Sequence, residues 1–196
     1  AGDVNGDGYA DLVVGAYYQD APATDEGNAF VYLGGATGVP ATPTITLDNP
    51  ANQAGGYFGY SVASAGDVNG DGYAGVVVGA SLQDSGATDE GNTFVYLGGA
   101  TGVPATPTIT LDNPANQRHG YFGLSVASAG DVNGDGYADL VVGASGQDSP
   151  AYVGGNAFVY LGDATGVPAT PTITLDNPAN QSGGEFGRSV ASAGDV

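Results

Sequence analysis

A repeat of 64 residues runs through the whole chain. AGDVNGDGYADLVVGA opens the sequence, returns 64 residues later as AGDVNGDGYAGVVVGA, and returns in its first form after the same interval. One aspartate marks the same place in every copy, at Asp3, Asp67, Asp131 and Asp195. Residues 3–66 differ from residues 67–130 at ten positions, and residues 67–130 differ from residues 131–194 at thirteen. Such a long, regular period predicts a propeller, a solenoid or an array whose units bury their faces against neighbouring units.

Each unit contains four runs that are typical of β-strands, and no pattern typical of a helix. FGYSVASA at 58–65 is rich in small residues, which suits a crowded position near a central axis. DLVVGA at 11–16 is continuously apolar and therefore predicts a strand buried on both faces.

The other two runs alternate in polarity. NAFVYLG, from Asn28, places Phe30 and Tyr32 on one face of a strand and Val31 and Leu33 on the other. PTITLDNP, which follows it, has a proline at each end and is typical of an outer edge strand. Four short strands in about 64 residues match the size of a propeller blade.

We therefore expect an all-β fold of propeller blades, each with four antiparallel strands, and three blade-equivalents in the chain. The expected division is a partial blade of strands two to four at 1–57, complete blades at 58–121 and 122–185, and the first strand of a further blade at 186–196. A three-bladed ring falls below the usual four to eight blades, and unpaired strand edges favour aggregation.

The two incomplete ends are complementary in this scheme. We expect residues 186–193 to pair beside a strand like the one at 11–16, supplied either by another copy or by continuing chain in a longer array. Two copies joined head to tail would form a six-bladed ring, whereas a rotation that does not close would give an open filament.

The loop DVNGDGYAD, at 3–11 in the first unit, has the composition of a Ca²⁺ site. Ca²⁺ takes six to eight oxygen ligands, and alternate residues of a tight loop can direct them inward, with Gly8 available for a sharp turn. The first loop offers side-chain oxygens from Asp3, Asn5, Asp7 and Asp11, and the backbone carbonyl of Tyr9. The corresponding ligands are Asp67, Asn69, Asp71 and Tyr73 in the loop at 67–75, and Asp131, Asn133, Asp135, Tyr137 and Asp139 in the loop at 131–139.

The middle loop has Gly75 in place of the last aspartate, so we expect that site to bind Ca²⁺ more weakly. The alternative is that these aspartates only cap turns, although three or four spaced ligands rarely recur by chance.

These motifs together resemble the FG-GAP repeat of integrin alpha-subunit propellers and of many secreted bacterial proteins. The resemblance covers the whole chain and rests on Phe58-Gly59 and its two later copies, on the DxNxDG loop, and on VVGA. It implies four-stranded blades with Ca²⁺ in the loop between the first two strands. The chain departs from the family pattern at Gly75, and at Tyr17, Ser81 and Ser145, where the family's GAP has proline.

Composition excludes several classes of function. The chain carries 21 acidic residues against two arginines, for a net charge of −19. A protein that binds nucleic acids or anionic membrane surfaces needs clustered lysine and arginine, so neither is an expected partner of this chain. The sequence has no long apolar run that would insert into a membrane and no cysteine for disulfides.

No constellation in the sequence predicts catalysis. The one histidine, His119, lies in a turn of a single repeat, and we interpret it as a surface residue. The acidic pair Asp25-Glu26 recurs as Asp89-Glu90, and we interpret it as a solvated loop.

Several tyrosines near turns vary between units: Tyr17, Tyr18, Tyr57, Tyr60 and Tyr121. They suit packing between blades, or else stacking on sugars.

The expected function is that of an extracellular or cell-surface Ca²⁺-binding protein with a structural or adhesive role. Its expected partners are copies of itself, with extracellular proteins or glycans as further candidates. The alternatives are a carbohydrate-binding propeller lectin and the accessory propeller of a secreted enzyme.

Overall fold

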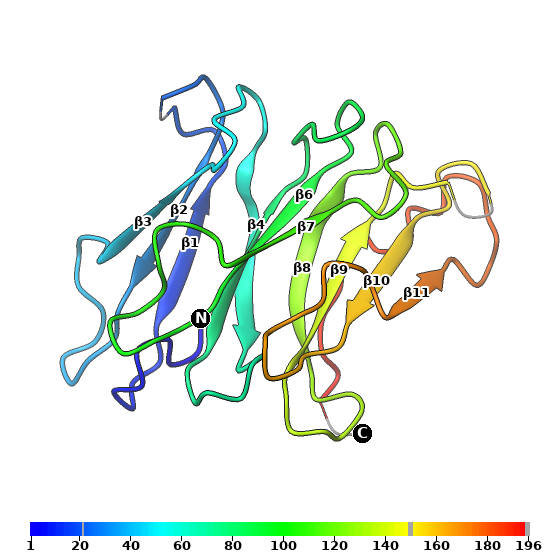
Figure 1. Ribbon diagram of the computed structural model, residues 1–196. Coiled ribbons are helices and arrows are strands. Elements are labelled where there is room, and N and C mark those ends of the chain that lie inside the picture. Colours follow the sequence, from blue (N-terminus) through cyan, green and yellow to red (C-terminus); the bar gives the residue numbers. More distant parts are fainter. Residues whose placement is uncertain (21, 149–150, 195–196) are drawn as a thin grey trace.

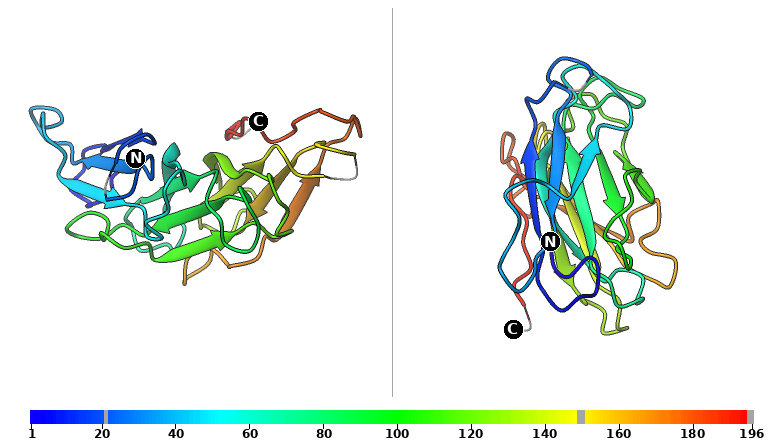
Figure 2. Two further views of the ribbon diagram at one scale, coloured as in Figure 1. Left: turned by 90° about the horizontal axis from the view of Figure 1, so that it is seen from above. Right: turned by 90° about the vertical axis from the view of Figure 1, so that its left-hand side faces the viewer.

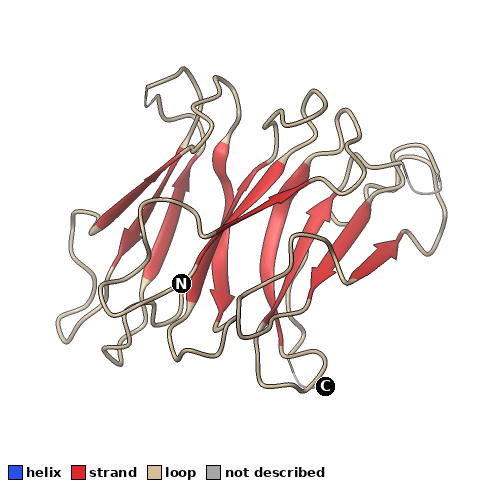
Figure 3. Cartoon of the chain, in the orientation of Figure 1, coloured by secondary structure: helices blue, strands red, loops and turns tan. Residues whose placement is uncertain are grey.

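The secondary structure consists of strands and loops. The computed structural model describes residues 1–20, 22–148 and 151–194, and Figure 3 shows no helix among them. Within those residues, therefore, nothing forms a helix able to cross a membrane. The expected all-β fold is confirmed, and each of the four predicted runs forms a strand. The fourth repeat aspartate, Asp195, lies outside the described residues.

The strands form three antiparallel sheets in which each strand pairs with the next along the chain. The first sheet contains β1 (Leu12–Ala16), β2 (Asn28–Tyr32) and β3 (Ile45–Asp48). The second contains β4 (Phe58–Gly66), β5 (Gly75–Ala80), β6 (Asn92–Tyr96) and β7 (Ile109–Asp112). The third contains β8 (Phe122–Gly130), β9 (Asp139–Ala144), β10 (Asn156–Tyr160) and β11 (Ile173–Asp176). The prolines of the fourth run agree with its position, because β3, β7 and β11 each lie at the edge of a sheet.

The sheets stand side by side like blades and do not close into a ring (Figure 1). Seen from above in Figure 2, they follow an arc, and both chain ends lie on its concave side. The small residues of β4 and β8 allow these long first strands to approach each other closely, and the Ser61 hydroxyl donates a hydrogen bond of 2.7 Å to the Gly123 carbonyl.

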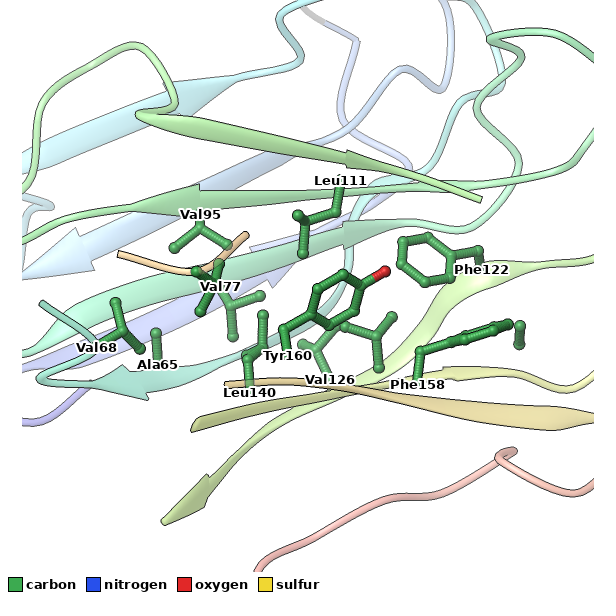
Figure 4. Packing of buried hydrophobic residues seen from close by; sticks show 13 residues of the cluster. Ala65, Val68, Val77, Val95, Leu111, Phe122, Val126, Leu140, Phe158 and Tyr160 are labelled. Atoms are coloured by element: carbon green, nitrogen blue, oxygen red, sulfur yellow. The ribbon is translucent and has the colours of Figure 1, made fainter. Parts of the chain in front are cut away.

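The hydrophobic core lies between the sheets. Between the second and third sheets, Val77, Val95 and Leu111 pack against side chains that include Leu140 and Tyr160 (Figure 4). The cluster between the first two sheets is built from the corresponding positions of the repeat. As the alternation of NAFVYLG predicts, neighbouring side chains of β6 face opposite ways and contribute to different clusters.

Two glycines of the repeat meet at every boundary between blades. A Cβ atom on Gly15, at the end of β1, would lie 1.9 Å from the carbonyl oxygen of Gly59, at the start of β4. The same contact joins Gly79 to Gly123 at 2.0 Å. Any side chain here would push neighbouring sheets apart, which explains why glycine follows phenylalanine in one motif and precedes alanine in the other.

The structure differs from the sequence-based expectation at both ends. β5 and β9 are buried on both faces, as predicted, but β1 exposes Leu12 and Val14 because no sheet packs in front of it. Residues 186–194, expected as the first strand of a further blade, carry no strand assignment. A strand needs a hydrogen-bonded neighbour, and the single chain offers this segment none on its outer edge.

Candidate metal centre

The three aspartate-rich loops lie at the same edge of the structure, the lower edge in Figure 1. In each complete sheet the loop joins the first two strands. The second glycine of each loop turns with a positive φ, of 88° at Gly8, 90° at Gly72 and 93° at Gly136. An L side chain is strained in this conformation, so the predicted sharp turn at Gly8 is confirmed and requires glycine.

The first aspartate of each loop accepts backbone hydrogen bonds. Asp3 Oδ1 accepts from the N–H groups of Gly6 at 2.7 Å and Asp7 at 3.1 Å, and Asp3 Oδ2 accepts from Gly8 at 2.9 Å. Asp131 makes the same bonds in the third loop. The backbone N–H of Gly136, followed by those of the other loop residues, lowers the pKa of Asp131 below its ordinary value. The loop therefore stabilises the ionised carboxylate that a cation would bind.

The next two predicted ligands lie beside each other in the same turn. The Asn5 amide donates to Asp7 Oδ2 at 2.9 Å, and Asp7 Oδ1 accepts from the backbone N–H of Tyr9 at 2.9 Å. The middle and third loops repeat both bonds at the corresponding residues. The structure thus brings the side-chain oxygens of Asp3, Asn5 and Asp7 into one exposed loop.

Asp11 lies deeper than the other predicted ligands. Its carboxylate is buried and accepts 2.7 Å hydrogen bonds from the backbone N–H groups of Val4 and Gly34. Asp139 makes the equivalent bonds in the third blade, at 2.7 and 2.9 Å. This aspartate ties the start of the loop to the connection after the third strand of its blade, a structural role that the ligand pattern did not reveal. Gly75 removes both bonds from the middle blade.

The donor set suits a hard cation. Each site offers carboxylate and amide oxygens and no sulfur or imidazole, which is the chemistry that Ca²⁺ prefers. Asp3 Oδ2 and Asp7 Oδ1 each accept one N–H bond and so still have a lone pair for a cation. In the described part of the chain, however, no three side chains of His, Cys, Asp or Glu converge on one point. A bound cation would therefore need to draw the oxygens of Asp3, Asn5, Asp7 and Asp11 together.

Neighbouring loops contact each other, a feature that sequence reasoning missed. The backbone N–H of Ala74 donates to the Asp3 carbonyl at 2.9 Å, and Ala138 donates to the Asp67 carbonyl at the same distance. The ring of Tyr73 lies against Gly6, where a Cβ atom would approach it to 2.7 Å. The invariant glycine and tyrosine of the repeat explain this contact, but only the packing of one blade on the next brings them together.

We expected the acidic pairs Asp25-Glu26 and Asp89-Glu90 to be solvated, and for the second residue of each pair this prediction is wrong. Glu26 and Glu90 are completely buried. Their backbone carbonyls accept the N–H groups of Phe58 and Phe122, which lie at the start of the next blade, at 2.8 Å. The adjacency of two acidic residues predicts solvent exposure, whereas this contact turns the second of them inward.

His119 is half exposed, and its Nδ1 lies 2.9 Å from Asp89 Oδ2. Sequence reasoning did not identify this carboxylate partner. No described serine, threonine or tyrosine forms a hydrogen bond with the imidazole, so the pair lacks a nucleophile among the residues whose contacts are known.

Four of the five variable tyrosines form a cluster between the first two blades, and the fifth, Tyr121, lies beside His119. Tyr17 and Tyr18, after β1, contact Tyr57 and Tyr60, at the start of the second blade, with ring centroids 5.0–5.5 Å apart. A hollow of about 450 Å³ opens beside them, lined by residues 15–20. The rings thus pack between blades and also leave an aromatic surface exposed.

Comparisons with known proteins agree with this architecture. A sequence profile described as the FG-GAP repeat matches residues 1–32, 58–96 and 122–161, which together make up more than half of the chain.

Integrin alpha-5 of Xenopus laevis is 31% identical over 193 residues, covering 92% of this chain and 18% of that protein. Integrin alpha-IIb of Mus musculus is 37% identical over 154 residues, covering 76% and 14%. Integrin alpha pat-2 of Caenorhabditis elegans is 35% identical over 175 residues, covering 81% and 13%. The chain thus spans less than a fifth of the length of these relatives. By its repeat, its blades and these matches, the chain belongs to the FG-GAP repeat family.

Proposed function

We propose that this chain is an extracellular Ca²⁺-binding FG-GAP protein with a structural or adhesive role and no catalytic activity of its own. The observation that carries the proposal is the repeated loop geometry, in which an aspartate that accepts backbone N–H bonds, an asparagine and a second aspartate share one turn at the same edge of all three sheets. The likeness to integrin alpha chains supports a role in adhesion at the cell surface.

The cation would have a structural task. Each loop concentrates carboxylates on a protein whose net charge is already −19, and their mutual repulsion disfavours the folded loop. Ca²⁺ would neutralise that charge and fix the loop. Because the Asp3 carbonyl accepts the N–H of Ala74, a fixed loop would also hold its neighbour in place.

Ca²⁺ titration calorimetry and thermal melts with and without a chelator test the proposal. We expect two tighter sites, in the first and third loops, and one weaker site in the middle loop. Chelation should lower the melting temperature by several degrees or more, since a ligand that binds only the folded state stabilises it.

Two matched variants assign the sites. Asp135→Asn changes an exposed ligand of the third loop and should remove one tight site. Asp71→Asn is the same change in the middle loop and should remove only the weak one. A chain that binds no Ca²⁺ and melts identically in chelator would refute the proposal.

A lectin activity is the second candidate, favoured by the cluster of Tyr17, Tyr18, Tyr57 and Tyr60. Tyrosine rings beside a hollow offer a stacking platform for sugar rings. A glycan array probed with the wild type and with Tyr18→Ala, which alters an exposed ring, distinguishes the two candidates. The third candidate, an accessory propeller beside a secreted enzyme, requires no binding or catalytic group of its own among the described residues.

A further inference from the structure

The loops at the edge opposite the metal loops carry most of the differences between the repeat units. From the first unit to the second, this edge changes at Tyr17, Tyr18, Ala54, Gly55 and Tyr60, whose counterparts are Ser81, Leu82, Arg118, His119 and Leu124. The metal loops, by contrast, differ only at Gly75. Binding groups are commonly held on variable loops of a constant framework, so this edge is where a function particular to one blade boundary would lie.

A hollow of about 460 Å³ lies at this edge, the upper edge in Figure 1, between the second and third blades. Its walls come from the segment before β8 and from the loop between β9 and β10, and they include Arg118, His119, Tyr121, Asp148, Tyr152 and Val153. Both walls belong to the boundary between two complete blades. The volume is within the usual range of small-molecule sites, about 300–1,000 Å³.

Gly146 keeps the hollow open. The same repeat position is Leu82 in the second unit, where a side chain is present. A Cβ atom on Gly146 would lie 2.0 Å from the carbonyl oxygen of His119 and 2.7 Å from Cδ2 of Tyr121. The loop of the third blade therefore passes directly against His119, and no side chain fills the space beside the Tyr121 ring.

His119 adopts an unfavourable backbone conformation beside this space. Its φ is 56°, in the left-handed region, where the equivalent residues are Gly55 and Gly183. A residue with a Cβ atom is strained there and glycine is not. The contact of Nδ1 with Asp89 Oδ2 fixes the direction of the imidazole. Strain of this kind concentrates at binding sites, which makes the hollow a candidate site.

Arg118 supplies an unpaired positive charge. The chain has 21 acidic residues and only two arginines, and the other arginine, Arg188, pairs with Glu185. Arg118 is exposed, and its guanidinium forms no ion pair or hydrogen bond with any residue that the structure describes. A guanidinium that no carboxylate of the protein occupies is available to a carboxylate of a ligand, which it can bind through two parallel hydrogen bonds.

The opposite wall has lost negative charge. Val153 and Gly154 occupy the positions that Asp89 and Glu90 occupy in the second unit. One arginine is therefore gained, and two carboxylates are lost, at the same blade boundary. Both changes favour an anionic group in the hollow.

The rest of the lining suits a ring that carries hydroxyl groups. Tyr152, which replaces Thr88, is 74% exposed and offers an aromatic surface together with Tyr121. Asp148 Oδ1 accepts the backbone N–H of Val153 at 2.7 Å, and Asp148 Oδ2 has no hydrogen-bond partner in the described part of the chain. This second oxygen can accept a hydroxyl of a ligand.

We propose that the hollow binds a sugar acid, a sugar residue such as a hexuronic acid whose ring carries a carboxylate. Arg118 pairs with the carboxylate, Asp148 accepts a hydrogen bond from a ring hydroxyl, and the C–H face of the sugar packs on a tyrosine ring. A neutral sugar would leave the guanidinium unused, and an acidic peptide side chain would offer Asp148 no hydroxyl. The net charge of −19 repels polyanions, so the best ligand is a neutral glycan with one acidic residue.

This inference rests on the lectin candidate, to which it adds a second site and a class of sugar. Titration calorimetry with an oligosaccharide that contains one glucuronic acid, and with the same oligosaccharide carrying glucose instead, tests it. The acidic form should bind at least about tenfold more tightly, because a hydrogen bond to a charged group contributes enough for such a factor. Arg118→Gln, at an exposed position, should remove this preference. Arg188→Gln is the matched control and should bind as the wild type does, since Arg188 does not line the hollow.

The outcomes separate this site from the other proposals. A wild type that binds no acidic oligosaccharide overturns the inference, and so does an Arg118→Gln protein that keeps the preference. Binding of neutral sugars that Tyr18→Ala removes and Arg118→Gln does not would support the lectin candidate and refute this site. A peptide with one carboxylate that binds more tightly than the acidic oligosaccharide would refute the assignment to sugars. Ca²⁺ titration of Arg118→Gln tests the metal loops independently, because no loop residue is changed.

Discussion

Gly75→Asp should stabilise the middle blade. In the other two blades this position is a buried aspartate whose oxygens accept two backbone N–H bonds. The corresponding donors in the middle blade are the N–H groups of Val68 and Gly98, at the same repeat positions. A Cβ atom on Gly75 would lie 3.0 Å from the Tyr96 carbonyl, which is tight, but the neighbouring blades accommodate aspartate in the same frame. The substitution therefore restores an arrangement that the fold already accepts twice.

The size of the effect follows from the two bonds. Hydrogen bonds to charged groups contribute about 1.5–3 kcal/mol each. Burying the carboxylate offsets much of that gain, so we expect a net increase of about 1–3 kcal/mol in the free energy of unfolding. For a domain of this size each kcal/mol raises the melting temperature by about 2–4 °C. The expected rise is therefore about 2–12 °C in chelator, with a further gain in Ca²⁺ because the middle site regains a carboxylate.

Scanning calorimetry of three variants measures this effect. Gly75→Ala reports the crowding and the lost glycine entropy, and Gly75→Asn supplies the shape of aspartate with one oxygen and no charge. Only Gly75→Asp should exceed the wild type in chelator and also tighten the weakest Ca²⁺ site. If its melting temperature equals that of Gly75→Ala, the two N–H groups do not reach the carboxylate and the reasoning is wrong.

Three other outcomes are expected. At a dilution that keeps the chain monomeric, Leu140→Ala should lower the free energy of unfolding by about 2–5 kcal/mol. Leu12→Ala is at the same repeat position but half exposed, so it should lower that free energy by less than about 1 kcal/mol. Equal losses of the two variants in chemical denaturation would contradict the packing described. The buried hydroxyl of Tyr160 has no partner among the described residues, and burial raises the pKa of its phenol, so stability from this residue is present below about pH 10 and is lost as the pH rises further. Tyr160→Phe should therefore leave stability at neutral pH unchanged or higher and reduce unfolding in alkali, as followed by circular dichroism. The pKa of Asp131 is lowered in the folded state, so this carboxylate stabilises the fold at pH values above its unfolded pKa of about 3.9. That contribution is lost as the pH falls through the folded pKa. Asp131→Asn should therefore flatten the acid side of a plot of melting temperature against pH.

The sequence alone predicted most of the blade. The alternation of NAFVYLG assigned Val31 and Phe30 to opposite faces, and the prolines around ITLD indicated an edge strand, because both signals are local. The burial of Glu26 could not be predicted in this way. An acidic pair in a loop predicts exposure to solvent, but the Glu26 carbonyl accepts the N–H of Phe58 from the next blade and its side chain is buried. The contact of Gly15 with Gly59 was equally inaccessible, since it joins residues that only the packing of two sheets brings together.

The sequence predicted which residues belong to the metal loop, but not which of them are exposed and which are buried. Spacing identified Asp3, Asn5, Asp7 and Asp11 as one ligand set, and the turn at Gly8 is as expected. The sequence could not separate the exposed Asp3 from the buried Asp11, because burial depends on where Val4 and Gly34 present their N–H groups. Nor could the sequence show that no sheet packs against the outer face of β1, since the half-exposed Leu12 is the same residue type as the fully buried Leu140.

The paired glycines at each blade boundary also bear on how such a gene can change. Every boundary uses the same contacts, so a recombination that removes residues 67–130 would join Gly66 to Asp131 and still give each sheet a neighbour of the kind it has now. Adding one 64-residue unit would likewise leave the contacts at each blade boundary unchanged. A change that shifted the strand register would bring a bulkier residue to the position of Gly59 or Gly123 and separate the sheets. Length variation within the strands of such chains should therefore occur in whole periods, because the close contact of two glycines at each boundary fixes the strand register.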